Sequence, residues 1–414
     1  MSATFYHNLP NGLQIVHRKT TSPVVYVGIM VGAGTRHELP NENGMAHYIE
    51  HCVFKGTQHY TARQIINHIE GIGGEINAYT TKEETTFYAA TLHNHFRTTL
   101  HLLADMVLRP TFCKKETDKE VTVILDEIES YNDSPSELIY DDFENMIFEG
   151  SSLAMPILGT KKTLRLISKS PDIALYWMKM HYRPERMVLF VLGNVSTQQV
   201  ISAAEKELLA SSPYRPIASS PITHSEASYS PSRASRTYSR HTHQTHIMLG
   251  SHTYPIGHPK QLTMYLLNNI LGGGSMSSRL YLSLREKHGL VYNIDSQAVP
   301  LSDTGYWNIY LACEPQHKDQ CLELCHKELK QLRDTTLTSA QLQRALRQLE
   351  GQMAISAENQ ENNALAMAKQ MLYHRQAPAW QETFAKVQQI TPYQLQDVAN
   401  EVFAPEKVYT LLYD

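Results

Sequence analysis

The chain has 414 residues, and its 37 Lys and Arg against 41 Asp and Glu give a formal net charge of −4. This balance provides no basic surface for nucleic acid and no excess of positive charge for an anionic membrane. Hydrophobic residues make up 42% and charged residues 19%, as in ordinary globular proteins. Residues 1–7 lack the features of a signal peptide, and no run of eighteen apolar residues occurs. We therefore expect a cytoplasmic protein that neither crosses a membrane nor binds nucleic acid.

The first predicted elements that bear on function are a strand and a short helix. Residues 24–31 form an apolar run that predicts a buried strand, and residues 44–56 then carry an H-x-x-E-H sequence made by His47, Glu50 and His51. In a helix, residues four apart lie one turn above each other, so the two imidazoles can bind one metal ion. Glu50 lies on the same side, where it can take a proton from water at the metal. Helices with ordinary histidines show the same pattern by chance, so a further ligand has to decide.

A helix predicted further along, over residues 116–131, offers such a ligand. Apolar residues recur there at helical spacing, whereas Glu116, Glu120 and Glu127 gather on another face. A cluster of this kind is more often a solvated helix face than a binding site. A catalytic zinc ion takes three protein ligands and leaves its fourth position open, so one carboxylate from this helix would complete the site.

The second half of the chain resembles the first in its order of elements. Residues 211–235 are rich in Ser and Pro and show no periodicity, which indicates a linker between a domain over 1–210 and another over 236–414. Strand pairs predicted over 76–92 and 292–311 occupy matching places, so the halves form a degenerate repeat. Each half is predicted to be an α+β layer structure, with helices packed on one face of a sheet. The second half has no H-x-x-E-H sequence, so one metal site per chain is expected.

Further stretches accompany the motif over nearly the whole chain, at residues 32–36, 73–80, 182–195 and 284–292. Together with the inverted motif H-x-x-E-H, they resemble the pitrilysin and insulinase family of zinc peptidases, which includes the mitochondrial processing peptidase. The resemblance implies two similar α+β domains, each a mainly antiparallel sheet with helices on one face. It also implies one Zn²⁺ ion per chain, bound in the first domain.

The resemblance assigns the remaining metal-site residues. In this family the third zinc ligand is a Glu roughly 75 residues beyond the second His, which corresponds to Glu127. The metal ligands would then be His47, His51 and Glu127, with Glu50 as the catalytic base. Glu120 lies two helical turns before Glu127 and matches a family Glu that orients a ligand.

The resemblance also assigns residues that bind substrate. Asn77 and Ala78 match a strand whose exposed edge pairs with the substrate backbone, and Arg285 and Tyr292 match a pair that reaches the substrate from the second domain. One departure is visible, because Ser151–Ala154 replaces the His-Pro-Leu-Gly that relatives often carry. This change affects local packing or specificity rather than the metal ligands.

The implied function is a zinc-dependent endopeptidase that cleaves peptides or unfolded polypeptides. Family enzymes enclose the substrate between two bowl-shaped halves of two domains each, so a two-domain chain implies a dimer. A homodimer is favoured because one chain carries both the zinc ligands and the Arg–Tyr pair, although a heterodimer with another subunit stays open. The alternative function is a non-catalytic subunit that binds peptides or scaffolds a complex, but such subunits typically lose zinc ligands or the base.

Overall fold

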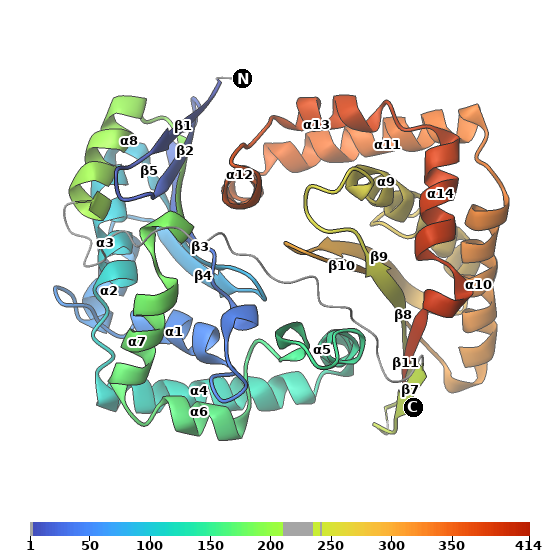
Figure 1. Cartoon of the computed structure of the whole chain (residues 1–414), viewed down its shortest axis with the longest axis horizontal. Coiled ribbons are helices and arrows are strands. Elements are labelled where there is room, and N and C mark those ends of the chain that lie inside the picture. The colour runs from blue at the N-terminus through green and yellow to red at the C-terminus, as the bar shows by residue number, and fades with distance from the viewer. Residues whose placement is uncertain (1–2, 210–234, 241) are drawn as a thin grey trace. The chain divides into compact units, whose positions relative to one another are not determined.

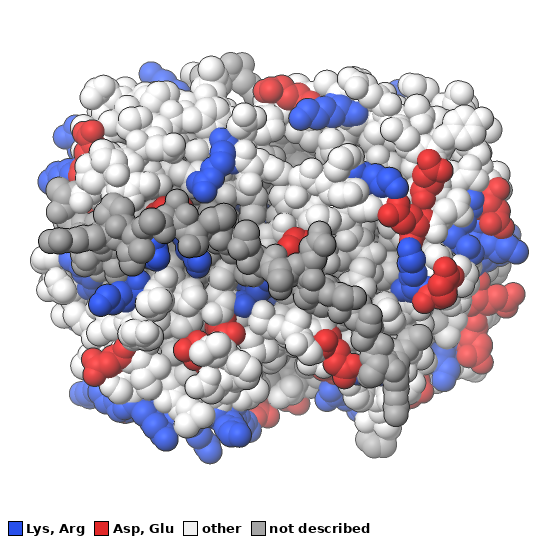
Figure 2. Space-filling model, in the orientation of Figure 1, with Lys and Arg blue, Asp and Glu red and all other residues white. Residues whose placement is uncertain are grey.

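The structure is a computed structural model that describes residues 3–209, 235–240 and 242–414 (Figure 1). The predicted linker, residues 211–235, lies outside the described residues except for its last position. Within the part of the chain that the structure describes, no helix is both long and apolar enough to cross a membrane. On the face shown in Figure 2, acidic and basic side chains are interspersed, and neither sign of charge covers it.

The chain folds into two compact units, and neither unit is continuous in sequence. The first unit takes in the described residues of Met1–Glu129, Met155–Thr223 and Ser356–Pro378. The second takes in those of Ser130–Ala154, His224–Ile355 and Ala379–Asp414. Each half of the sequence therefore contributes a segment to the unit that the other half mainly builds.

The first unit is built on a six-stranded sheet in the order β1-β2-β6-β3-β5-β4. Only β2 and β6 run parallel, and the other neighbours are antiparallel. The strands are β1 (Thr4–Asn8), β2 (Gln14–Lys19), β3 (Val24–Val31), β4 (Glu75–Thr80), β5 (Thr85–Leu92) and β6 (Met187–Gly193). Strand β4 lies at the end of this order and pairs with β5 alone among the described strands.

Helices cover both faces of this sheet, in agreement with the burial of all seven residues of β6. On one face, the main core joins the sheet to α1 (Met45–Val53), α2 (Ala62–Glu70), α3 (Phe96–Leu108), α4 (Lys114–Asn132), α6 (Lys161–Ile167), α7 (Pro171–His181) and α8 (Thr197–Ala204). On the other face lies α12 (Gln360–His374), on the opposite side from α2 and α3 (Figure 1). The Tyr88 hydroxyl donates to Glu361 of α12 (2.6 Å).

The second unit has a five-stranded sheet in the order β7-β11-β8-β10-β9, in which only β7 and β11 run parallel. This order repeats the order β2-β6-β3-β5-β4 of the first unit, which confirms the predicted repeat. The strands are β7 (Ser235–Tyr238), β8 (Thr245–Thr253), β9 (Val291–Pro300), β10 (Gly305–Cys313) and β11 (Tyr409–Tyr413).

Both faces of the second sheet are covered as well. One face packs against α9 (Gln261–Leu271), α10 (Lys318–Asp334), α11 (Ser339–Glu358), α13 (Trp380–Val387) and α14 (Pro392–Val402). The other packs against α5 (Pro135–Ile147), a helix from the first half of the sequence (Figure 1). The Tyr413 hydroxyl donates to Asp142 of α5 (2.7 Å). The α+β class is thus as predicted. The prediction of helices on one face of each sheet was incomplete, because α12 and α5 cover the second faces.

Candidate metal centre

The helix α1 presents the motif residues to one side because its other side is buried. Met45, Ile49 and Cys52 have no exposed surface and belong to the main core of the first unit. A helix that buries residues at these spacings turns the residues between them to the opposite side. His47, with 7% of its surface exposed, and the less buried Glu50 and His51 therefore lie on a common face of α1. The helix α4 brings Glu127 to this face.

The three predicted metal ligands meet in the structure. Glu127 Oε2 lies 3.5 Å from His51 Nε2 and 3.8 Å from His47 Nε2, and the three ligand atoms all lie within 4.8 Å of one another. Two imidazole nitrogens and one carboxylate oxygen form the donor set of a catalytic zinc site with an open position. The residues present therefore fit a zinc ion. Among the described residues, this is the one group of three or more His, Cys, Asp or Glu side chains that could hold a metal.

Two of the three predicted ligands, His47 and Glu127, are shifted toward the deprotonated form that metal binding requires. Burial, followed by the neighbouring His51, lowers the pKa of His47 to about 4, so its imidazole is neutral at pH 7. The hydrogen bond with His51 holds the pKa of Glu127 below its ordinary value, so this carboxylate is ionised. Burial lowers the pKa of His51, but hydrogen bonds with Glu127 and Glu120 outweigh it and raise the pKa overall. Metal ligands must be deprotonated, so a divalent cation would bind in competition with a proton on His51.

Glu120 lies behind His51, on the far side of its ring from the metal position. Glu120 Oε2 is 3.2 Å from His51 Nδ1, and Glu120 Oε1 is 2.8 Å from the ammonium of Lys55. A carboxylate on the second nitrogen of a ligating imidazole fixes the tautomer and the ring orientation. Glu116, the remaining Glu of the predicted cluster, instead forms an ion pair with Lys119 (3.0 Å).

Glu50 does not join the ligand group and is held separately. Thr80 Oγ1 donates to Glu50 Oε2 (2.6 Å), and burial raises the pKa of Glu50 above its ordinary value. Sequence reasoning missed Thr80, although it ends β4, the strand that contains Asn77 and Ala78. These two residues pair with Tyr88 and Phe87 of β5, so the outer edge of β4 has no partner strand among the described residues.

Arg285 and Tyr292 lie together in the second unit. The Arg285 guanidinium carbon is 5.4 Å from the centre of the Tyr292 ring, and Arg285 also donates to the Tyr281 hydroxyl. Tyr292 is 85% exposed, so its ring is available to a ligand. The Ser151–Ala154 stretch also belongs to the second unit, where Leu153 is buried beside α5.

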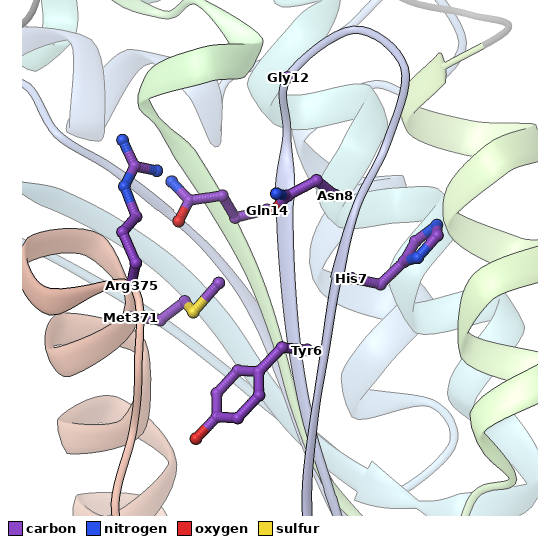
Figure 3. Close-up of a pocket in the computed structure, with 7 residues that line it drawn as sticks. All are labelled: Tyr6, His7, Asn8, Gly12, Gln14, Met371 and Arg375. Atoms are coloured by element: carbon purple, nitrogen blue, oxygen red, sulfur yellow. The ribbon is translucent and has the colours of Figure 1, made fainter.

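A separate hollow lies in the first unit, away from the metal ligands. It has a volume of about 570 Å³ and is lined by Tyr6, His7, Asn8, Gly12, Gln14, Met371 and Arg375. Gln14 points toward Arg375 at the end of α12, whereas His7 points to the other side of the hairpin (Figure 3). None of the candidate metal-site residues lines this hollow.

Known proteins resemble this chain along its whole length. Residues 14–161 match the family profile described as "Insulinase (Peptidase family M16)", and residues 170–349 match "Peptidase M16 inactive domain". A Bacillus subtilis protein, named as the uncharacterized zinc protease YmxG, is 32% identical over 406 residues, which cover 97% of this chain and 96% of that protein. The chain belongs to peptidase family M16. An uncharacterized zinc protease of Streptomyces coelicolor is 31% identical, over 95% of this chain and 86% of its own length.

Two solved structures share the fold of this chain. A protease from Helicobacter pylori superimposes with a TM-score of 0.89 at 20% identity, over 100% of this chain and 99% of that one. A Pseudomonas fluorescens protein described as a peptidase M16 inactive domain gives a TM-score of 0.88 at 19% identity, over 99% and 97% of the two chains. The chain therefore has the M16 fold, and its relatives are named as zinc proteases.

Proposed function

We propose that this M16 chain is a zinc-dependent endopeptidase that cleaves unfolded peptides. The observation that carries the proposal is the convergence of His47, His51 and Glu127 within 4.8 Å, with Glu50 fixed beside them by Thr80. A non-catalytic subunit, the alternative function, has no need of both an intact ligand set and a positioned base.

The chain's own groups divide the work of hydrolysis. Zinc held by His47, His51 and Glu127 would polarise the scissile carbonyl and make water acidic enough to act near neutral pH. Glu50 accepts the proton of the attacking water and passes it to the leaving amine. The raised pKa of Glu50 suits both transfers, because a more basic carboxylate accepts a proton more readily and keeps it long enough to donate. Glu120 and Lys55 keep the His51 ring in place during these steps.

Substrate would bind as an additional strand on the outer edge of β4. Backbone hydrogen bonds beside Asn77 and Ala78 would supply affinity without strong sequence preference. Only an extended segment can pair in this way, so unfolded peptides are the expected substrates. Proline at a paired position of the substrate removes a donor and should block cleavage.

We also propose that the chain acts as a homodimer in the cytoplasm, with one zinc ion per chain. In this arrangement Arg285 and Tyr292 would bind substrate beside the zinc site. Their contact in the second unit and the exposure of the Tyr292 ring support such a role. A heterodimer with a different subunit is the competing assembly. The mass of the purified complex distinguishes the two, and imaging of a tagged chain tests the location.

Zinc content and turnover of variants test the proposal. His47→Ala and Glu127→Ala should bring bound zinc well below one ion per chain, because each removes a ligand. Glu50→Gln should keep the zinc and abolish cleavage of a peptide library. Mass spectrometry of the library after incubation measures the cleavage. Glu116→Ala is the matched control on α4, since Glu116 faces Lys119, and it should change neither property. Full zinc in both ligand variants would refute the site, and zinc without any cleavage by the wild-type protein would favour the non-catalytic subunit.

A further inference from the structure

The zinc-site helix α1 is capped by a residue outside both the helix and the motif. Its N-cap residue is Gly44, which has a φ of 92° and no side chain that could accept a hydrogen bond. The acceptor is Glu38 instead, whose Oε2 binds the Gly44 amide (2.8 Å) and whose Oε1 binds the Ala46 amide (2.7 Å). These amides belong to the group of backbone donors that a helix start leaves without intrahelical partners.

The Glu38 carboxylate is held firmly inside the protein. Only 4% of its surface is exposed. The carboxylate accepts a third hydrogen bond from the Asn43 side chain, at Oε2 (3.2 Å). Asn43 also donates to the Pro156 carbonyl (2.9 Å), which ties this cap to a distant loop. Burial of a carboxylate is costly and raises the pKa of Glu38, whereas the hydrogen bonds from Ala46, Gly44 and Asn43 act in the opposite direction and favour the ionised form.

Other helix starts in the same unit are capped more simply. Thr61 caps α2 by accepting from the Gln64 amide, and Ser196 caps α8 by accepting from the Gln199 amide. Each of these caps is the residue next to its own helix and lies at the surface. A surface hydroxyl would therefore suffice for α1 if helix stability were all that was required.

The feature that distinguishes α1 is the place of His47 in its first turn. His51 is oriented by Glu120, and Glu50 is oriented by Thr80, each through a side-chain hydrogen bond. His47 Nδ1 is buried and has no hydrogen-bond partner among the described residues. A ligating imidazole usually has such a partner, which sets its orientation. The position of His47 must therefore depend mainly on its own backbone. The preceding residue, Ala46, donates its amide to Glu38, so Glu38 holds the backbone next to His47.

We propose that Glu38 is a positioning residue for zinc binding, which fixes His47 through the backbone of the first turn of α1. This inference rests on the proposed role of His47 as a zinc ligand. It predicts that loss of the Glu38 carboxylate frays the first turn and moves His47 away from the metal position. The second turn, with Glu50 and His51, stays in place because it has its own partners.

A double-mutant cycle on the full chain tests this inference by zinc affinity, measured in competition with a chelator. Glu38→Ala should weaken zinc binding by about tenfold or more, the scale seen when a group behind a metal ligand is lost. In the His47→Ala background the same change should have no further effect, because no ligand is left for Glu38 to position. Glu38→Gln keeps one carbonyl acceptor and should recover part of the affinity, and it replaces Glu38→Ala in the cycle if that variant does not fold.

The matched control is Thr61→Ala, which removes the cap of α2 and should leave zinc affinity unchanged. Equal losses from Glu38→Ala in both backgrounds would show a merely structural role and overturn the inference. The inference is also wrong if His47→Ala weakens zinc binding and Glu38→Ala does not, although the proposed function would then stand. If His47→Ala itself leaves zinc affinity intact, the ligand assignment fails, and the role of Glu38 fails with it.

Discussion

Histidines in the first unit differ in their surroundings, and these surroundings determine their protonation. The pKa of His181 is lowered to about 4 by burial and then by the charge of Arg186, and its ring packs on Trp177 at 4.4 Å between centroids. In the unfolded chain the His181 ring is protonated below about pH 6.5. In the folded protein the ring stays neutral until the pH falls to about 4. Stability from neutral His181 is therefore complete above pH 6.5 and is lost as the pH falls toward 4.

The variant His181→Phe isolates this contribution, because phenylalanine keeps a ring against Trp177 and does not titrate. Between pH 7 and pH 5, the wild-type free energy of unfolding should fall by about 1–2 kcal/mol more than that of the variant. Urea unfolding at the two pH values measures the difference. Identical pH dependence in both proteins would mean that the His181 ring accepts a proton in the folded state.

At this scale the sequence is informative where a helix fixes the spacing. His47, Glu50 and His51 could be placed on one face because residues three and four apart share a face. Glu127 needed the family resemblance, since helical geometry does not link α1 to α4 across the intervening chain. Thr80 had no local signal, because its partner Glu50 lies 30 residues earlier in the chain. Glu38 was missed because it caps α1 from six and eight residues away, outside the usual N-cap position.

At the scale of elements, the positions of the helices in the sequence were easier to predict than the sheets against which they pack. The apolar periodicity of 338–374 indicates helices, but it does not say which sheet they cover. The uninterrupted apolar run of β6 is typical of a strand buried on both faces, a signal that a second helical layer was needed. That α12 fills this place, and α5 the matching one, depends on long-range packing that a local pattern does not contain.

The helix α5 comes from the first half of the sequence but packs in the second unit, and α12 comes from the second half but packs in the first unit. A mutation in either helix should therefore destabilise the sheet of the unit in which it packs. Met367 of α12 is 2% exposed against the first sheet, and Phe143 of α5 is fully buried against the second. Met367→Ala should therefore loosen β6, and Phe143→Ala should loosen β8, each by about 2–5 kcal/mol of local stability from the cavity left behind.

Amide hydrogen exchange, followed on peptides from β6 and β8, measures the local stability of both strands in one experiment. Exchange should quicken in β6 for Met367→Ala and in β8 for Phe143→Ala, and Met276→Ala is the control because Met276 is 72% exposed. If each variant instead loosened the sheet of its own half of the sequence, the assignment of the two helices would be wrong.

At the scale of the whole molecule, one chain carries two sets of candidate functional residues in different units. The proposed zinc ligands belong to the first unit, and Arg285 and Tyr292 belong to the second. The expected division into 1–210 and 236–414 followed from a linker that lies outside the described residues, so the sequence halves stay a prediction. The family resemblance implies that the zinc domain of longer members faces the last domain of the opposite half. If the proposed homodimer follows this arrangement, each site would combine residues of two chains.

Subunit mixing tests this sharing of sites. If Arg285 of one chain completes the zinc site of its partner, Glu50→Gln and Arg285→Ala should each be weak or inactive alone. A mixed dimer would still hold one site with both wild-type residues. With free exchange at equal amounts, about half of the dimers are mixed and each has one good site of two, so roughly a quarter of wild-type activity should return. This recovery should appear only as fast as subunits exchange, which fluorescence transfer between labelled chains can follow. Demonstrated exchange without recovery would mean that Arg285 and Tyr292 act within their own chain or do not contact the substrate.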